Sequence, residues 1–307
     1  MQAVRKTSKV IAIACADIHA SLNPPLARVG ERNWFEAMAR PLRELKALSD
    51  EHQAPILCAG DIFDRWNSSP EVINFMLEEM PPMMAIPGQH DLPLHELSSI
   101  MKSAFWTLVK AGKVIPITNA TMHVDSGFAV RGFPYGGELS ESDDCDSLSI
   151  AVIHKYIWMP GHSYPDAPTE GHVNVVGKTL AGYDVIISGD NHRGFCYRFG
   201  KRTLFNCGTL MRRKSDEIHY KPQAGLIYAD GHVDTVYLDT SADVIERVDG
   251  PEALDTDESV DEFLADLLSL QNAALDFAEA VRRTLDAKRP SQAVRRIIMK
   301  AMEQDTK

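Results

Sequence analysis

Short apolar runs alternate with longer amphipathic segments in the first part of the chain. Three runs, 10–15, 55–59 and 83–86, have the length of buried strands. Between them, residues 33–52 repeat apolar positions at helical spacing, and a second helix is expected after Pro70. A strand–helix–strand–helix–strand order predicts parallel pairing through crossover helices, and such sheets carry their sites at the carboxyl ends of the strands.

The pattern changes after a further predicted helix at about 97–110. Residues 113–133 form short alternating segments, which indicate antiparallel strands and a second sheet. Apolar runs at 148–153 and 184–188 predict two more buried strands, and hairpins follow to about residue 238. The long Pro- and Gly-rich loop after His154 has the length typical of functional loops.

The last part of the chain is acidic and predicted to be helical. We therefore divide the chain into a domain at 1–240 and an acidic helical extension at 241–307. Apolar stripes begin near 259, 275 and 294 at the spacing of amphipathic helices. These stripes either pack onto the main domain or dock a partner, and the sequence leaves both open.

Composition narrows the class of protein. The hydrophobic fraction of 44% and charged fraction of 24% are ordinary for a globular protein. No apolar run approaches the roughly 20 residues of a membrane helix, and the N-terminus does not resemble a signal peptide. The five cysteines include no CxxC pair, which indicates reduced thiols. We therefore expect a cytoplasmic protein without a membrane partner.

The net charge of -11 bears on nucleic-acid binding. Proteins that coat DNA are usually basic, so the charge counts against that class. Carboxylates gathered around metal ions and an acidic tail would, however, make the net charge more negative without repelling a substrate at the site.

Polar side chains of one kind follow the predicted strands. Each strand is followed by Asp, His or an amide, and residues two apart in an extended segment point the same way. The strand-end groups are Asp17, His19, Asp61, Gln89, His90, Asp91, His154, Asp190 and His192. Carboxylate, amide oxygen and imidazole together suit ions such as Mn²⁺, and two ions about 3.5–4 Å apart can bridge a phosphate and activate water.

The order of these motifs resembles that of the calcineurin-like metallophosphoesterase family over about residues 9–240. The motifs are Asp17-Ile18-His19, Gly60-Asp61-Ile62-Phe63-Asp64, Gly88-Gln89-His90-Asp91, His154 and Gly189-Asp190-Asn191-His192. Within the family the chain is most similar to the nuclease subunit of SbcCD-type DNA repair complexes and its phage relatives. That similarity depends on the Ala-Asp-Ile-His and Gly-Asp-Ile-Phe-Asp forms and on residues 206–213. The resemblance implies an α/β sandwich of two mixed sheets flanked by helices.

The resemblance also implies roles for these residues. One ion would be held by Asp17, His19 and His192, a second by Gln89, His154 and Asp190, with Asp61 bridging the two. His90 would contact the scissile phosphate, and Asp91 would orient its ring. Arg193, Arg212 and Arg213 follow the site in sequence, and they either contact substrate phosphates or form a solvated basic run.

Two positions depart from the family pattern. Gln89 stands where the family has Asn, and Asp190 stands where it usually has His. Both residues still offer oxygen ligands. We therefore hypothesise a second ion site that is richer in oxygen and more selective for Mn²⁺ or Mg²⁺ than for zinc.

The leading interpretation is a DNA exonuclease or endonuclease that uses two divalent ions, Mn²⁺ first and Mg²⁺ second. DNA and an SbcC-like ATPase subunit would be its partners, and the resemblance also allows a homodimer. One alternative keeps the metal site and takes a small phosphodiester or a phosphoprotein as substrate. Another is a non-catalytic scaffold of the same fold, although every site position here remains capable of binding metal.

Overall fold

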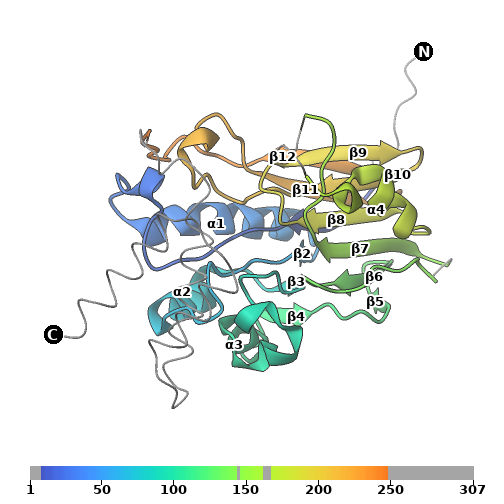
Figure 1. Cartoon of the computed structure of the whole chain (residues 1–307), viewed down its shortest axis with the longest axis horizontal. Coiled ribbons are helices and arrows are strands. Elements are labelled where there is room, and N and C mark those ends of the chain that lie inside the picture. Colours follow the sequence, from blue (N-terminus) through green and yellow to red (C-terminus); the bar gives the residue numbers. More distant parts are fainter. Residues whose placement is uncertain (1–7, 144–145, 162–166, 248–307) are drawn as a thin grey trace, which may run out of the picture. The chain divides into compact units, whose positions relative to one another are not determined.

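Two six-stranded sheets pack face to face in the computed structural model of this protein, which describes residues 8–143, 146–161 and 167–247. Helices cover the outer face of each sheet (Figure 1). This architecture confirms the predicted α/β sandwich of two mixed sheets flanked by helices.

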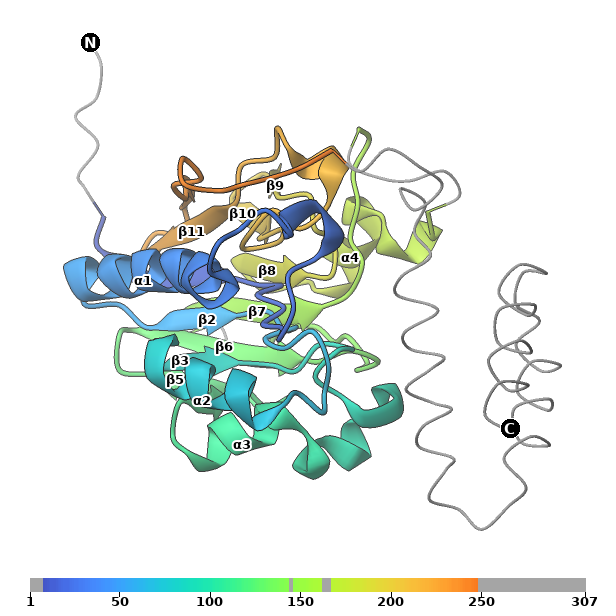
Figure 2. The ribbon, with the colours of Figure 1, turned by 90° about the vertical axis from the view of Figure 1, so that its left-hand side faces the viewer.

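The first sheet runs in the order β12-β11-β1-β2-β3-β4. Its strands are β1 Val10–Cys15, β2 Ile56–Cys58, β3 Met83–Ala85, β4 Val114–Pro116, β11 Gln223–Tyr228 and β12 Val233–Tyr237. Strands β1 to β4 are parallel, and β11 pairs antiparallel with β1. Helices α1 (Trp34–His52), α2 (Pro70–Glu79) and α3 (Ala104–Lys110) lie on its outer side, where Figure 2 shows them together. Asn33 and Ser69 cap the first turns of α1 and α2.

The second sheet runs in the order β5-β6-β7-β8-β10-β9. Its strands are β5 Met122–Val124, β6 Phe128–Phe133, β7 Leu148–His154, β8 Val185–Gly189, β9 Phe195–Phe199 and β10 Arg202–Asn206. The four central strands are mutually parallel. Helix α4 (Val173–Thr179) packs on the outer face. Short 3-10 helices complete the described part: η1 Leu26–Arg28, η2 Pro93–His95, η3 Leu97–Lys102, η4 Thr169–Gly171 and η5 Ser215–Glu217.

The layer between the sheets is fully apolar in its centre. Ala12 and Ala14 of β1 and Leu57 of β2 meet Val152 of β7 and Ile187 of β8, all of them buried. The small alanines on β1 let the two sheets approach closely, while Val10 and Ile13 of β1 and Ile56 of β2 pack with residues of α1 and α2. Every strand that ends at the site is thus buried on both faces, which gives the site a rigid base.

Two sequence predictions of elements need correction. The helix expected at 97–110 is divided at Ser103, whose extended backbone and hydroxyl cap α3 through the N–H of Trp106. The segment expected to be wholly antiparallel contains β4, which joins the first sheet parallel to β3, and β6, which is parallel to β7. A crossover helix precedes β4, and that connection favours parallel pairing.

The compact unit of the described chain extends to Arg247. The backbone N–H of Val244 donates to the Glu31 side chain, and that of Glu246 donates to the carbonyl of Ala27. The unit therefore includes residues just beyond the predicted boundary at 240. The helices predicted from about 259 onward lie outside the described residues. Over the described ranges, no helix combines the length and apolar character needed to cross a membrane.

Candidate metal centre

The carboxyl ends of five strands meet at one edge of the sandwich. In the first sheet these are β1, β2 and β3; in the second they are β7 and β8, where His154 lies in register with Gly189. The N–H of Asp17 donates to the Gly60 carbonyl at 3.0 Å, and the N–H of His19 donates to the Asp61 carbonyl at 3.0 Å. The structure therefore brings the side chains of the five predicted motifs to one place.

Backbone strain is concentrated in this region. Asp17, His19, Asp61 and Asp190 have φ of 51°, 49°, 53° and 82°, in the left-handed region that costs a non-glycine residue about 1–2 kcal/mol. The strained turns are tied to each other. The N–H of Asp190 donates to both Asp17 carboxylate oxygens, at 3.2 and 3.1 Å, and the N–H of Leu210 donates to the Asp17 carbonyl at 3.2 Å. Strain held in this way is typical of functional sites.

Two glycines make room for site side chains. A Cβ atom at Gly88 would collide with Oδ1 of Asp61, and one at Gly60 would collide with Nδ1 of His154. Gly60 also has a φ of 99°, a value that residues other than glycine rarely adopt. The motifs thus require glycine for close packing as well as for turning the chain.

One group of ligand atoms comes from Asp17, His19 and His192, whose ligand atoms all lie within 4.8 Å of one another. The Nε2 atoms of the two histidines are 3.2 Å apart. Burial and the nearby Arg213 guanidinium lower the pKa of His19 well below its usual value and that of His192 to about 3. Both imidazoles are therefore neutral at pH 7, the form that binds metal.

A second group consists of Asp17, Asp61 and His154, again within 4.8 Å. The Nδ1 of His154 lies 2.6 Å from the carbonyl of Ala59, which can only accept, so Nδ1 carries a proton. Its Nε2 faces two further acceptors: Oε1 of Gln89 at 2.6 Å and Oδ2 of Asp61 at 3.3 Å. A neutral His154 would thus direct a lone pair at two oxygen atoms, an arrangement that requires a cation or an added proton.

The amide of Gln89 links this group to Asp190. Its Nε2 donates to Oδ1 of Asp190 at 3.1 Å, which fixes Oε1 as the atom that faces His154. The extra methylene of Gln relative to Asn therefore does not remove the carbonyl oxygen from the site. Both departures from the family pattern lie side by side and present oxygen atoms.

The excess of buried acceptors fits divalent cations. Oδ2 of Asp61 and Nδ1 of His19 are buried and accept or donate no hydrogen bond among the described residues. Burial and the neighbouring carboxylates of Asp61 and Asp190 raise the pKa of Asp17, because like charges disfavour a further anion. Although burial alone would lower it, the Asp61 carboxylate raises the pKa of His154, so a proton is retained when no metal is present. Oxygen and imidazole donors in this mixture suit Mn²⁺ or Mg²⁺ better than soft ions.

His90 lies next to these groups and is partly exposed. A ring nitrogen of His90 lies within 4.8 Å of a ring nitrogen of His19 and of a carboxylate oxygen of Asp61. The backbone N–H of His90 donates to Oδ1 of Asp61 at 3.0 Å. The Nδ1 of its ring is 2.9 Å from the carbonyl oxygen of Asp64 and so donates to it. The ring is therefore oriented by a backbone carbonyl.

The described contacts of Asp91 differ from the expectation that it orients the His90 ring. The Asp91 carboxylate accepts from the backbone N–H groups of Ile62, Phe63 and Gly88, at 3.2, 3.0 and 3.0 Å. Oδ2 accepts two of these hydrogen bonds and Oδ1 accepts the third. Asp91 instead fastens the loop after β2 to the loop after β3. Burial and the Asp61 carboxylate raise the pKa of Asp91 to about 7.

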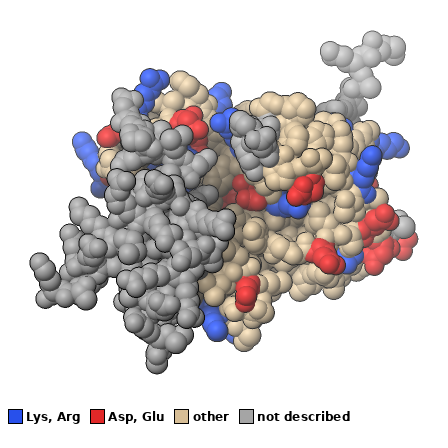
Figure 3. Space-filling model, in the orientation of Figure 1, with Lys and Arg blue, Asp and Glu red and all other residues tan. Residues whose placement is uncertain are grey.

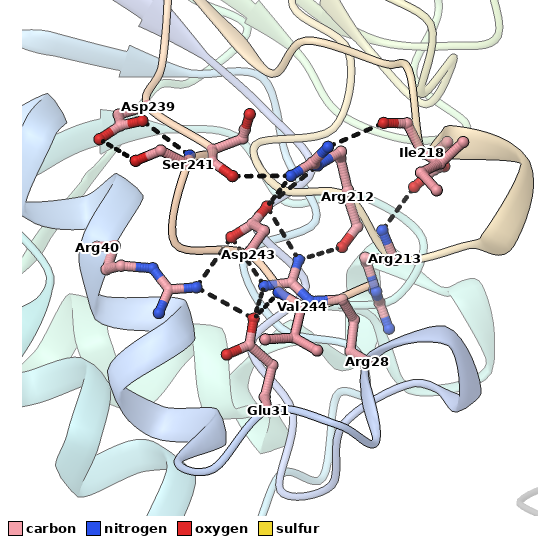
Figure 4. Close-up of polar contacts among 12 residues, drawn as sticks. Arg28, Glu31, Arg40, Arg212, Arg213, Ile218, Asp239, Ser241, Asp243 and Val244 are labelled. Carbon is pink, nitrogen blue, oxygen red and sulfur yellow. Dashed lines mark hydrogen bonds and ion pairs between the residues drawn. The ribbon is translucent and has the colours of Figure 1, made fainter. Parts of the chain in front are cut away.

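Arg212, for which substrate contact and a solvated basic run were both open, is engaged with other parts of the protein. Figure 4 shows its guanidinium among protein acceptors, and it donates to Asp243, Ile218 and Thr240. With each guanidinium nitrogen engaged, Arg212 holds residues 240–243 in place.

The other two arginines differ from Arg212 in their surroundings. Arg213 pairs with Asp64 at 2.6 Å, close to His19, and Arg193 is 65% exposed beside Asp216 at 3.7 Å. Arg213 therefore lies at the edge of the site, whereas Arg193 lies at the surface.

Sequence reasoning gave no role to several residues that support or border the site. Asn206 donates to the carbonyls of Asn191 and Arg193, and Thr209 donates to the carbonyl of Asp17, so both fix the site loops. Tyr135 and Lys155 border a cavity next to the site. Both lie just after the end of a strand, β6 or β7, the same signal that marked the other motifs.

Carboxylates and imidazoles that meet at the carboxyl ends of the strands, as they do here, are typical of metal-dependent hydrolases. Residues 12–233 match the model of the family described as calcineurin-like phosphoesterase, and the chain belongs to this family. The match covers the five motifs. No curated protein matches the chain.

Several solved structures are similar to this chain at low sequence identity. The protein TT1561 of Thermus thermophilus is 14% identical over 74% of this chain and 97% of its own, with a TM-score of 0.44. A structure described as a novel archaeal phosphodiesterase is 12% identical over 74% and 99%, with a TM-score of 0.38. The phosphopantetheinyl hydrolase of Mycobacterium tuberculosis is 11% identical over 75% and 96%, with a TM-score of 0.41. Likenesses of this strength say nothing about substrate.

Proposed function

We propose that this protein is a phosphodiesterase that uses two divalent ions to hydrolyse DNA, as an exonuclease or an endonuclease. The observation that carries the proposal is the overlap of three ligand groups through Asp17, His19 and Asp61. His90 belongs to the group that also contains His19 and Asp61. Shared ligands between adjacent groups suit a pair of ions rather than one. A pair of ions in turn suits an anionic phosphoryl substrate.

The ligands divide between the two ions as follows. We assign Asp17, His19 and His192 to one ion, Gln89, His154 and Asp190 to the other, and Asp61 to both. Mn²⁺ is the first choice because both sets combine oxygen donors with imidazole, and Mg²⁺ is the second because oxygen donors dominate the second set. When bound, such ions polarise a phosphoryl oxygen and make a water molecule nucleophilic at neutral pH.

His90 is assigned to the leaving group. Hydrolysis adds a water oxygen to phosphorus and breaks the bond to the ester oxygen, which leaves with the electron pair and needs a proton. Because Nδ1–H of His90 donates to the Asp64 carbonyl, Nε2 is the nitrogen that can face the leaving oxygen, and it supplies the proton when the ring is a doubly protonated imidazolium. The ring then regains a proton from the attacking water molecule. General acid catalysis of this kind contributes about 10²–10⁴-fold. Arg213, held by Asp64 at the edge of the site, is a candidate for contacting the substrate phosphate.

Support for DNA as substrate comes from the resemblance of residues 16–19, 60–64 and 206–213 to SbcCD-type nucleases. The net charge and the face drawn in Figure 3 give no such support. The net charge is -11, and on the face in Figure 3 the Lys and Arg side chains are scattered among Asp and Glu. An SbcC-like ATPase that grips DNA would supply the missing attraction, and we propose it as partner. A homodimer is a further proposal from the same resemblance.

A small phosphodiester is the second candidate substrate. The observation in its favour is a cavity of about 370 Å³ bordered by His154 and Asp190, a size that suits a compact ligand. This alternative keeps the same ions and the same role for His90.

Hydrolysis assays separate these alternatives. End-labelled single-stranded and duplex DNA would be incubated with Mn²⁺ and wild-type protein, His90→Ala, or His219→Ala as a control outside the site. We expect degradation by the wild type and the control, and a loss of about 10²-fold or more in His90→Ala. Hydrolysis of bis-p-nitrophenyl phosphate without action on any DNA would favour the small substrate. Inactivity on all of them, also with a candidate ATPase added, would contradict the proposal.

A further inference from the structure

A cavity lies against the side of the metal centre that contains His154 and Asp190. Its volume is about 370 Å³, and its walls are the chain leaving β6, the chain leaving β7 and the turn at 168–171. Both of the site residues that border it belong to the group assigned to the second ion. A substrate whose phosphate lies at the ions would therefore extend a neighbouring group into this space.

One wall of the cavity is aromatic. Tyr135 is 37% exposed, and its ring centroid lies 6.5 Å from that of His154 and 5.7 Å from that of His95. The backbone N–H of Tyr135 donates to the Pro87 carbonyl, which anchors this wall to the loop after β3. A partly exposed ring beside the reacting centre can stack on a flat ligand. Stacking of a base on an aromatic side chain contributes about 1–3 kcal/mol.

Charged groups complete the lining. Lys155 follows His154 directly, and its ammonium makes no hydrogen bond or ion pair within the described ranges. Glu170 lines the same cavity, so one donor and one acceptor accompany the aromatic wall. The edge of a nucleobase carries both acceptors and donors, whereas a phosphate carries acceptors only. The combination matches a base better than a second phosphate.

We propose that Tyr135, Lys155 and Glu170 form a subsite for the base of the nucleotide next to the scissile phosphate. The inference rests on the proposed hydrolysis of a phosphodiester in DNA. A base inside a duplex is stacked on both faces and paired along one edge, and moving it into a pocket of the protein costs a few kcal/mol. The subsite therefore takes an unpaired nucleotide, and hydrolysis of single-stranded or frayed DNA exceeds that of a fully paired blunt duplex.

The test compares substrates with and without a base. Wild type, Tyr135→Ala, Tyr135→Phe and Lys155→Ala would be assayed with Mn²⁺ on a single-stranded oligonucleotide and on bis-p-nitrophenyl phosphate, which has no base. We expect kcat/KM for the oligonucleotide, divided by kcat/KM for bis-p-nitrophenyl phosphate, to fall about 10-fold in Tyr135→Ala. The fall should come from a higher KM for the oligonucleotide. Tyr135→Phe keeps the ring and should keep the ratio. Tyr197→Ala removes a tyrosine on β9 and serves as the control.

Binding provides a second readout. Oligonucleotides carrying 2-aminopurine at the 5′ or the 3′ end would be titrated with metal-free protein. Stacking on Tyr135 predicts quenching of one of the two probes, lost in Tyr135→Ala and kept in Tyr197→Ala. If the wild type cleaves oligonucleotides but Tyr135→Ala keeps the wild-type KM and the quenching, the subsite is refuted and the nuclease proposal stands. If the wild type cleaves only bis-p-nitrophenyl phosphate, both proposals fail.

Discussion

Close contacts at single residues determine where the site side chains can lie. The Asp91 carboxylate collects backbone N–H groups from the loops after β2 and β3, and Gly88 leaves space for the Asp61 carboxylate between them. The carboxylate assigned to both ions is thus positioned by a residue without a side chain and by one that never touches the ions. Residues of this kind are as necessary to the site as its ligands.

Gly88→Ala tests this packing. The added methyl would displace the Asp61 carboxylate, so we expect a loss of hydrolysis of about 10²-fold, the size typical of small misplacements of catalytic groups. Gly200→Ala is a matched control, since Gly200 has positive φ but no atoms near the position of the new methyl. The control should cost about 1 kcal/mol of stability and keep its activity. Equal activity in both variants would contradict this account of Gly88.

The sequence predicts which residues gather at the site but not which partners they take. Asp17, His19 and the other strand-end groups could be identified because parallel strands share one edge, whatever the details of the loops. The partner of Arg212 could not, because Asp243 lies 31 positions away and only the folded chain brings the two together. The role of Asp91 was missed for a similar reason. Its partners are backbone N–H groups, and which of them face the carboxylate depends on the folded loops and not on the residue types.

At the scale of elements, a buried charge network fastens the end of the described chain to the site. Arg28 is fully buried and donates to Glu31, to Asp243 and to the backbone carbonyl of Arg212 (Figure 4). Arg40 of α1 pairs with the same two carboxylates. The loop at 209–212 that this network holds also packs against Asp17 and His192. The network therefore links α1, the segment around Asp243 and the metal centre.

Arg28→Met should lower the free energy of unfolding by about 3–5 kcal/mol, because it leaves two buried carboxylates short of a partner. Arg43→Met is the matched control. Arg43 is 50% exposed and pairs with surface carboxylates, so its loss should cost less than about 1 kcal/mol. Denaturant unfolding measures both values. A cost for Arg28→Met no larger than that for Arg43→Met would show that the network does not hold this part of the fold.

The sequence predicted some helices and strands more accurately than others. Helix α1 and the buried strands carry clear periodicity, and their positions agree with the prediction within a few residues. The break at Ser103 was missed because the apolar residues on both sides of it suggest one continuous helix. The partner of β4 depends on a crossover connection rather than on its own residues, so its sheet could not be read from alternation alone.

At the scale of the whole molecule, we expect the free energy of unfolding to depend on divalent ions, because buried acceptors gather at the site. Without ions, the carboxylates of Asp17, Asp61 and Asp190 lie close together, and burial raises the pKa of Asp17 and Asp190. An ion that binds only the folded state stabilises it by about 2.7 kcal/mol at 100 times its Kd. For a domain of this size, such stabilisation raises Tm by about 5–10 °C.

Chelation followed by thermal unfolding measures this dependence. We expect Tm to fall after treatment with EDTA and to recover when excess Mn²⁺ is added. Asp61→Asn should lose most of the recovery, whereas the exposed Asp216→Asn should keep it. A Tm that is the same with and without Mn²⁺ would contradict the assignment of these carboxylates to ions.

The most direct test of the central claim counts the ions. Metal-free protein would be titrated with Mn²⁺ by isothermal calorimetry, and the bound metal would be measured after gel filtration. We predict two Mn²⁺ per chain for the wild type and fewer for Asp61→Asn, whose carboxylate we assign to both ions. Binding of one ion or none to the folded wild-type chain would contradict the two-ion site.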